Sequence, residues 1–188
     1  MVKTAKKNTK IIQHGEKILR EKAKEVPVHE ITGKEIQKII ADMKNALSKE
    51  QDGVAIAAPQ IGISLRLFVV SGKAFALDKN PEVTEKEAND KSKYRDMAFV
   101  NPKLTKLSRK QPWEVEGCLS VRWLYGKVRR AEKATVTAYD ENGKKFTRGA
   151  SGLLAQIFQH ETDHLDGILF IDKAKDVEDL PPESINNK

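Results

Sequence analysis

The segment that decides the fold reads SGLLAQIFQHETDHLDG and covers residues 151–167. Its apolar residues recur at spacings of three and four, which is the period of an α-helix. Ser151 is a suitable N-cap and Gly167 a natural C-terminal stop. The apolar stripe continues up to His160, so we expect a helix that runs through the core.

This helix carries two histidines one turn apart, His160 and His164, with Glu161 between them. Positions i and i+4 of a helix differ by about 40° around its axis, so both rings can reach one metal ion. Glu161 lies beside them and can accept a proton from water at that ion. The pattern His-Glu-x-x-His is a signature of metal-dependent hydrolases, although paired helical histidines also occur as surface or core residues.

A catalytic site of this kind usually has a third protein ligand. Metallopeptidases with this pattern often use a downstream His or Glu, but no His follows His164, and Glu178 and Glu183 lie in a polar segment. Cys118, the only cysteine in the chain, cannot form an intrachain disulfide. Taken alone, a single free cysteine is most simply interpreted as a small buried apolar residue. In a chain that also has the two helical histidines, we interpret it as a metal ligand.

Residues 53–60 form a run of small residues that ends in Gln60. Small residues allow close approach of a substrate, and the Gln60 amide can donate to a carbonyl oxygen. An ordinary buried turn has the same composition, so this segment is weak evidence alone.

Together, residues 53–60, 116–120 and 159–164 resemble, in this order, the three motifs of the peptide deformylase family. The second motif, Glu-Gly-Cys-Leu-Ser, matches fully, and Asp163 precedes His164 as in the family. The resemblance extends over about residues 18–173.

The resemblance implies an enzyme that removes the formyl group from the N-terminal formyl-methionine of new polypeptides and releases formate. It implies one divalent metal ion held by Cys118, His160 and His164, with Fe²⁺ as the physiological ion and Zn²⁺, Ni²⁺ or Co²⁺ as alternatives. Glu161 would transfer the proton, while the Gln60 side chain and the Leu119 N–H would stabilise the oxyanion. We also expect Glu116 to pair with Arg130 or Arg129.

By the same resemblance the substrate lies extended and pairs its backbone with Val54 and Gly117 as an added strand. Leu153 and Ile157 share the metal-facing side of the helix and are expected to form the methionine pocket. The expected substrate-binding residues are Gly53, Val54, Gly117, Tyr125, Leu153 and Ile157, with Gln156 at the rim.

Two positions depart from the family pattern. Ala55 stands where the family usually has a second glycine, and Arg122 replaces the proline that usually follows Ser-Val. Neither departure touches a metal ligand or Glu161, so we expect activity. Arg122 also adds a cation near the substrate groove, so we expect altered specificity.

The rest of the chain predicts an α+β fold, with antiparallel strands packed around the histidine-bearing helix. Thr32 and Glu35 form a capping-box pattern before a helix that ends near Ser48. Strands are expected over residues 65–70 and 98–107, and a hairpin over 134–139 and 144–148 around Asn142-Gly143. The polar residues 72–96 predict a surface loop of low order.

With 188 residues, 39% of them hydrophobic, the chain has room for a single core. We expect a basic N-terminal extension (residues 1–15), a catalytic domain (16–174) and a polar C-terminal tail (175–188). No apolar run is long enough for a membrane helix. A single cysteine and no secretory segment at the N-terminus favour a cytoplasmic location.

The net charge of +7 suggests weak electrostatic attraction to the ribosome, but no signature of a specific nucleic-acid-binding module is present. Two rival functions remain: a metallopeptidase that uses the same helix with another third ligand, and a non-catalytic relative that binds acylated peptide N-termini. Replacing Cys118 by Ala should abolish metal binding in a deformylase but leave a metallopeptidase largely intact. Replacing Glu161 by Gln should abolish turnover in an enzyme while the metal stays bound.

Overall fold

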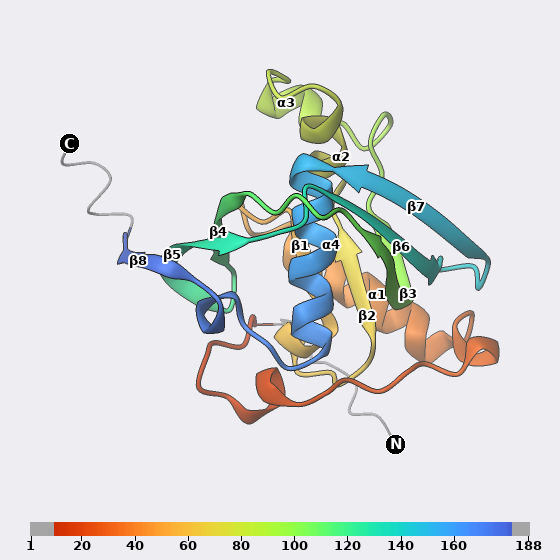
Figure 1. Ribbon diagram of the computed structural model, residues 1–188. Helices are drawn as coiled ribbons and strands as arrows, with labels where there is room; N and C mark the ends of the chain where they lie inside the picture. The colour runs from red at the N-terminus through yellow and green to blue at the C-terminus, as the bar shows by residue number, and fades with distance from the viewer. Residues whose placement is uncertain (1–9, 182–188) are drawn as a thin grey trace.

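The computed structural model describes residues 10–181, so most of the expected N-terminal extension and residues 182–188 of the expected tail lie outside the described part (Figure 1). The helices are α1 (Lys34–Leu47), α2 (Gly72–Lys79), α3 (Glu85–Ala88) and α4 (Gly152–Leu165), and short 3-10 turns are η1 (Lys17–Arg20), η2 (Val28–Glu30), η3 (Ala58–Ile61) and η4 (Phe170–Asp172). The strands are β1 (Ala55–Ala57), β2 (Leu67–Val70), β3 (Met97–Leu107), β4 (Trp113–Cys118), β5 (Val121–Arg129), β6 (Lys133–Tyr139), β7 (Lys145–Ser151) and β8 (Lys175–Asp179).

The main sheet has the strand order β1-β2-β3-β6-β7, and all neighbouring strands are antiparallel. Both of its faces are buried along β2. Leu67 and Val69 join the apolar cluster of α1, whereas Phe68 and Val70 join that of α4. Because successive strand residues point to opposite faces, α1 and α4 cover opposite sides of one sheet. The predicted α+β fold around the histidine-bearing helix is confirmed.

Aromatic packing holds α4 against this sheet. The Phe158 ring centroid lies 5.3 Å from that of Phe99 and 6.5 Å from that of Phe68, and all three side chains are fully buried. Such ring pairs contribute beyond their buried area. The helix that carries the two histidines is therefore fixed by the core itself.

A second sheet, with the order β4-β5-β8, lies on the other side of α4 in Figure 1. Strand β4 is at one edge of this sheet and carries Cys118 at its end. Strand β8 is at the other edge, where Tyr125 is paired with Glu178. Residues 175–179, which the sequence placed in the polar tail, thus extend this sheet as β8.

Two glycines set the ends of α4. Strand β7 runs directly into the helix, and Gly152 makes the turn with φ +54°. Ser151 is the N-cap residue as expected, although its hydroxyl accepts no capping hydrogen bond. Gly167 has φ +75°, and a Cβ there would lie 2.5 Å from the Arg20 carbonyl oxygen. Only glycine fits this stop without a shift of the backbone.

The predicted capping box before α1 is wrong. The N-cap is Gly33, one residue later than Thr32, and it makes no side-chain cap. The preceding turn η2 ends at Glu30, but the backbone of Ile31 is still helical, and Gly33 N–H donates to the Glu30 carbonyl at 2.8 Å. The chain therefore becomes extended only at Gly33, which moves the start of the helix.

The prediction of a loop of low order over residues 72–96 is also wrong, because the segment contains α2 and α3. Ser71 caps α2 by accepting from Ala74 N–H at 3.3 Å, and Asp96 accepts from Gly72 N–H at 2.9 Å. Thr84 and Glu87 form a capping box at α3. These cap signals were present in the sequence, but both helices are too short to show a clear apolar period.

The other predicted elements are confirmed with small changes of boundary: α1 ends at Leu47, and β2, β3 and the β6–β7 hairpin lie where the sequence placed them. The hairpin turn is closed by Asp140, whose carboxylate accepts from the N–H groups of Asn142 and Lys144. Within residues 10–181, none of the helices combines the length and apolar character needed to cross a bilayer.

A substitution at Gly72 tests the docking of residues 72–96. A Cβ there would lie 2.2 Å from the Tyr94 carbonyl oxygen, whereas one at Gly149 would meet Thr135 only at 3.8 Å. We expect Gly72→Ala to lower the free energy of unfolding by about 1–3 kcal/mol and Gly149→Ala to change it by less than about 0.5 kcal/mol. Urea denaturation of both variants measures this; equal stabilities would show that the segment is not packed as described.

Candidate metal centre

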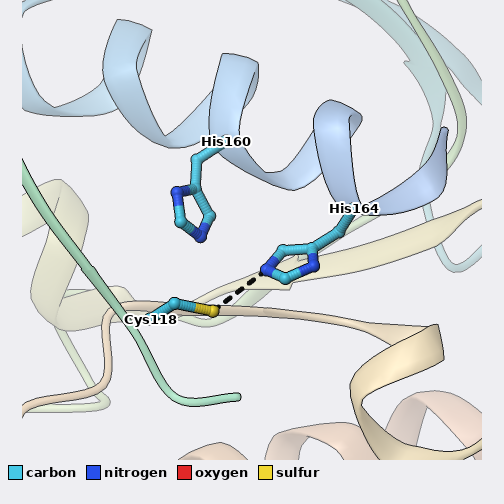
Figure 2. Close-up of side chains that lie close together, drawn as sticks. All are labelled: Cys118, His160 and His164. Carbon is cyan, nitrogen blue, oxygen red and sulfur yellow. Dashed lines mark hydrogen bonds between the residues drawn. The ribbon is translucent and has the colours of Figure 1, made fainter. Parts of the chain in front are cut away.

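Three donor side chains from two distant parts of the chain meet at one point (Figure 2). Cys118 comes from the end of β4, and His160 and His164 come from successive turns of α4. Their donor atoms lie within 4.8 Å of one another, and Cys118 Sγ is 3.2 Å from His164 Nε2. Both rings face the sulfur in Figure 2, so the predicted ligand set is brought together.

The sulfur of Cys118 is surrounded by donors. Ser120 N–H points to it at 3.4 Å and the Gln60 Nε2 amide at 3.5 Å. Hydrogen bonds to a ligand atom help to fix its position toward a metal ion. A bulge between Gly117 and Cys118 turns the sulfur out of the regular strand register and toward α4.

A buried carboxylate orients the first histidine. His160 Nδ1 lies 2.9 Å from Glu116 Oε2, and Arg130 donates to the same carboxylate at 2.6 and 2.9 Å. Burial alone would raise the pKa of Glu116, but the bonds from Arg130 and His160 outweigh it and hold the pKa at about 2. An ionised carboxylate only accepts, so Nδ1 carries the hydrogen and Nε2 is left for the cation.

This network continues away from the cavity. Arg130 also donates to Asp163 at 2.6 Å, and Lys173 reaches both oxygens of Asp163 at 2.8 Å. Of the two expected partners of Glu116, Arg130 is the correct one, while the Arg129 guanidinium lies over the Trp113 ring at 5.6 Å. This network of charges thus ties β4, the residue that follows β5, and α4 together at the site.

Burial shifts the pKa of Glu161 in one direction and acts on both histidines in the other. Burial raises the pKa of the Glu161 carboxyl to about 7. Burial also lowers the pKa of His164, and the neighbouring His160 lowers it further. For His160 burial acts in the same direction, but hydrogen bonds to Cys118 and Glu116 raise its pKa.

A metal ion fits this arrangement. Tetrahedral coordination with a metal–sulfur bond of about 2.3 Å and metal–nitrogen bonds of about 2.0 Å separates S and N by about 3.5 Å, close to the 3.2 Å between Cys118 and His164. Among the described residues, the buried Glu161 Oε2 has no hydrogen-bond partner. Such an orphaned oxygen beside three soft and borderline donors is expected where an ion and its water bind.

A cavity of about 260 Å³ opens next to these residues. Every residue that the sequence assigned to catalysis or substrate binding lines it, as do two of the three metal ligands; the residues are Gly53, Val54, Gln60, Gly117, Cys118, Leu119, Tyr125, Leu153, Ile157, His160 and Glu161. His164 lies behind it, fully buried. Gln156 is also at the cavity and donates to the Val115 carbonyl at 2.9 Å.

Gln60 is held in one orientation. Its Oε1 accepts from Ala57 N–H at 2.7 Å, and its Nε2 donates to Ser120 Oγ at 3.1 Å. The amide nitrogen is thereby fixed on the side of Cys118. Sequence reasoning missed Ser120 as this partner, although it belongs to the second motif; nothing in the sequence pairs residues 60 and 120.

Sequence reasoning also missed the partners of Arg122. Its guanidinium binds Asp52 at 2.5 Å and Glu50 at 2.6 Å, across about seventy residues of chain. Asp52 and Arg122 both line the cavity. The departure from the family pattern at position 122 was visible in the sequence, but its contact with the opposite wall was not.

An α+β fold with a Cys-His-His centre and a buried glutamate beside it defines a metal-binding hydrolase. The family model described as Polypeptide deformylase matches residues 8–179. The chain belongs to the peptide deformylase family.

Curated relatives agree with this assignment. Peptide deformylase 1A, chloroplastic/mitochondrial, of Arabidopsis thaliana is 42% identical over 87% of this chain and 60% of its own length. Peptide deformylase 2 of Clostridium acetobutylicum is 41% identical over 84% of this chain and 89% of its own length. The chain therefore spans less than two thirds of the plant relative but nearly all of the bacterial one.

Solved structures show the same fold. A peptide deformylase from Synechococcus elongatus in complex with actinonin superposes with a TM-score of 0.75 at 31% identity and covers 93% of this chain and 84% of that chain. A peptide deformylase from Legionella pneumophila gives a TM-score of 0.73 at 36% identity, covering 89% and 86%.

Glu116 is expected to control metal affinity through His160. Glu116→Gln should weaken Zn²⁺ binding by about 10- to 100-fold, because outer carboxylates orient their histidine ligands. Glu114→Gln is the matched control, since this residue lies two positions earlier on β4 and is exposed. Chelator competition on folded samples measures both affinities; an unchanged affinity in Glu116→Gln would contradict the orienting role.

Proposed function

We propose that this chain hydrolyses the formamide bond of N-formyl-methionyl peptides, yielding formate and a free N-terminal amine. The observation that carries the proposal is the convergence of Cys118, His160 and His164 beside the unpartnered carboxylate oxygen of Glu161. The chain's family supports the same reaction. Water adds to the formyl carbon, the C–N bond breaks, and one proton moves to the leaving nitrogen.

Cys118, His160 and His164 would hold a divalent ion, which would supply Lewis acidity toward water and the carbonyl oxygen. Glu161 is placed to receive a proton from the attacking water and to deliver it to the leaving amine. Burial raises the pKa of this carboxyl, which suits a group that must both accept and donate a proton. The apolar side chains around α4 limit the access of bulk water to these two proton transfers.

Two donors are proposed to stabilise the oxyanion that forms at the formyl carbon. Gln60 offers its Nε2 amide, which the bonds to Ala57 and Ser120 hold in place before substrate arrives. The Leu119 backbone N–H is the second donor, one residue after the metal-binding Cys118. A fixed donor costs no reorganisation during the reaction, which makes it effective.

The peptide is proposed to lie extended between two walls. Gly53 and Val54 form one wall and Gly117 the other, and β4 is at the edge of its sheet. An edge strand offers free backbone groups to a further strand. Leu153 and Ile157 line the cavity on the metal-facing side of α4 and are proposed to contact the methionine side chain, with Tyr125 at the rim.

We propose Fe²⁺ as the physiological ion, with Zn²⁺, Ni²⁺ and Co²⁺ as alternatives that the same ligands accept. The metallopeptidase alternative needs a third ligand other than Cys118, and the approach of Cys118 to His164 does not favour it. A non-catalytic binder has no use for an unpartnered, buried Glu161.

Formate release tests the proposal. Protein loaded anaerobically with Fe²⁺ should release formate from formyl-Met-Ala, and Glu161→Gln should lower kcat by about 10²–10⁴-fold because general acid–base transfer is lost. Metal content, measured on the same samples, should not change. A metal-loaded wild-type protein that releases no formate would refute the function, and a fully active Glu161→Gln variant would refute the role of Glu161.

We further propose that the enzyme acts in the cytoplasm and associates weakly with ribosomes through its net charge of +7. Co-sedimentation with ribosomes should then decrease steeply as salt is raised from about 50 to 200 mM. Absence of any salt-dependent co-sedimentation would remove this part of the proposal.

A further inference from the structure

One polar side chain holds the backbone of Leu119 from outside the cavity. The Gln13 side-chain amide donates from Nε2 to the Leu119 carbonyl at 3.0 Å, and at the longer distance of 3.4 Å to the Ile11 carbonyl. A carbonyl oxygen only accepts, so the amide nitrogen of Gln13 faces it. Gln13 is half-buried and is not one of the residues that line the cavity. It therefore reaches a proposed oxyanion donor without entering the space for substrate.

Backbone groups next to this side chain hold the second proposed donor. The Ile12 N–H donates to the Gln60 carbonyl at 2.9 Å, and the His14 N–H donates to the Ser120 carbonyl at 2.7 Å. We name residues 11–14 the N-terminal strap. Its three hydrogen bonds join η3, which carries Gln60, to the turn between β4 and β5. Both proposed oxyanion donors are thus held against one short segment of chain.

The turn between β4 and β5 depends on such support. Cys118 pairs with Val121, which leaves a turn of two residues between them. Leu119 and Ser120 occupy this turn, and neither has the positive φ of the turns that two-residue hairpins favour. The local sequence therefore does not fix the turn, and its geometry depends on tertiary hydrogen bonds. The carbonyl groups of both turn residues accept from the N-terminal strap.

We propose that Gln13 is a positioning residue for the reaction: its amide keeps the two-residue turn in the geometry that points the Leu119 N–H at the developing oxyanion. The inference rests on the proposed deformylase function and adds to it a residue that lies outside the cavity. A backbone donor is effective only if it is aimed before the charge develops. A misplacement of about 1 Å can cost about 10²-fold in rate, so a hydrogen bond that fixes the turn affects catalysis directly.

Gln13→Met is the test variant, because methionine keeps the length of the side chain but cannot donate. It should lower kcat for formyl-Met-Ala by about 5- to 50-fold, less than the about 10²–10³-fold that follows removal of an oxyanion donor itself. KM should stay within about twofold, because the oxyanion is absent from the ground state. Gln13→His, whose ring N–H can donate again, should recover most of the lost kcat.

Gln37→Met is the matched control. Gln37 lies on α1, outside the cavity lining, and its Nε2 likewise donates to backbone carbonyls, those of Ile31 at 2.9 Å and Glu141 at 2.7 Å. The two variants lose the same kind of hydrogen bond, so both should lower the urea midpoint of unfolding, but Gln37→Met should keep the wild-type kcat. Zn²⁺ affinity, measured by chelator competition, should be unchanged in each variant, because the proposed effect acts on Leu119 and not on a metal ligand.

The outcomes separate this inference from the proposed function. If the wild-type protein releases no formate, the proposed function itself fails. If formate is released but Gln13→Met keeps the wild-type kcat, loses Zn²⁺ affinity or changes mainly in KM, positioning by Gln13 is overturned. The same holds if Gln13→His is no faster than Gln13→Met, or if Gln37→Met loses as much kcat. A lower kcat at unchanged KM and Zn²⁺ affinity, restored in Gln13→His and absent in the control, supports the inference.

Discussion

The structure depends on one buried carboxylate. Glu116 accepts two hydrogen bonds from Arg130 and one from His160, and so connects the strand that carries the sulfur ligand to the helix that carries the nitrogen ligands. Burying charges is costly, and a buried ion pair is weak evidence of stability. Here all charges are matched, and the gain is geometric: the network fixes where Cys118 and His160 lie relative to each other.

The core supports this geometry from the other side. Phe158 packs on Phe68 and Phe99, so α4 cannot rotate about its axis without breaking the aromatic cluster. Gln159 fixes α4 further by hydrogen bonding. Its side-chain amide accepts from Ala131 N–H and donates to the Ala131 carbonyl, both at 2.9 Å. Residues adjacent to His160 in sequence thus position it by apolar packing and by hydrogen bonding at the same time.

The sequence predicted the parts of the site that depend on local spacing or on shared motifs. The two histidines share a helix face because they are four residues apart, and the motif around Cys118 identified the third ligand. Contacts that depend on the folded topology were harder to predict from the sequence. Arg129 and Arg130 are adjacent in the chain, and only the side-chain contacts of the folded structure show that Arg130 is the one that reaches Glu116. Arg122 binds Glu50 and Asp52, about seventy positions earlier in the chain, and no local pattern encodes these contacts.

The fold was predicted where periodicity was long. Helix α1, with buried residues at regular spacing, was found almost to the residue, but its start moved because η2 delays the extended conformation until Gly33. The segment with α2 and α3 was misread as a loop because short capped helices in a polar sequence give no amphipathic pattern. Tertiary contacts such as that of Gly72 with Tyr94 hold such helices, rather than propensity.

The central claim is that one sulfur and two ring nitrogens bind a single ion in this protein. X-ray absorption of the protein loaded with one equivalent of Zn²⁺ measures this ligand set directly. The account predicts one sulfur at about 2.3 Å and two imidazole nitrogens at about 2.0–2.1 Å, with a remaining light ligand. A spectrum of the folded, loaded protein without a sulfur neighbour, or with one imidazole or none, would contradict it.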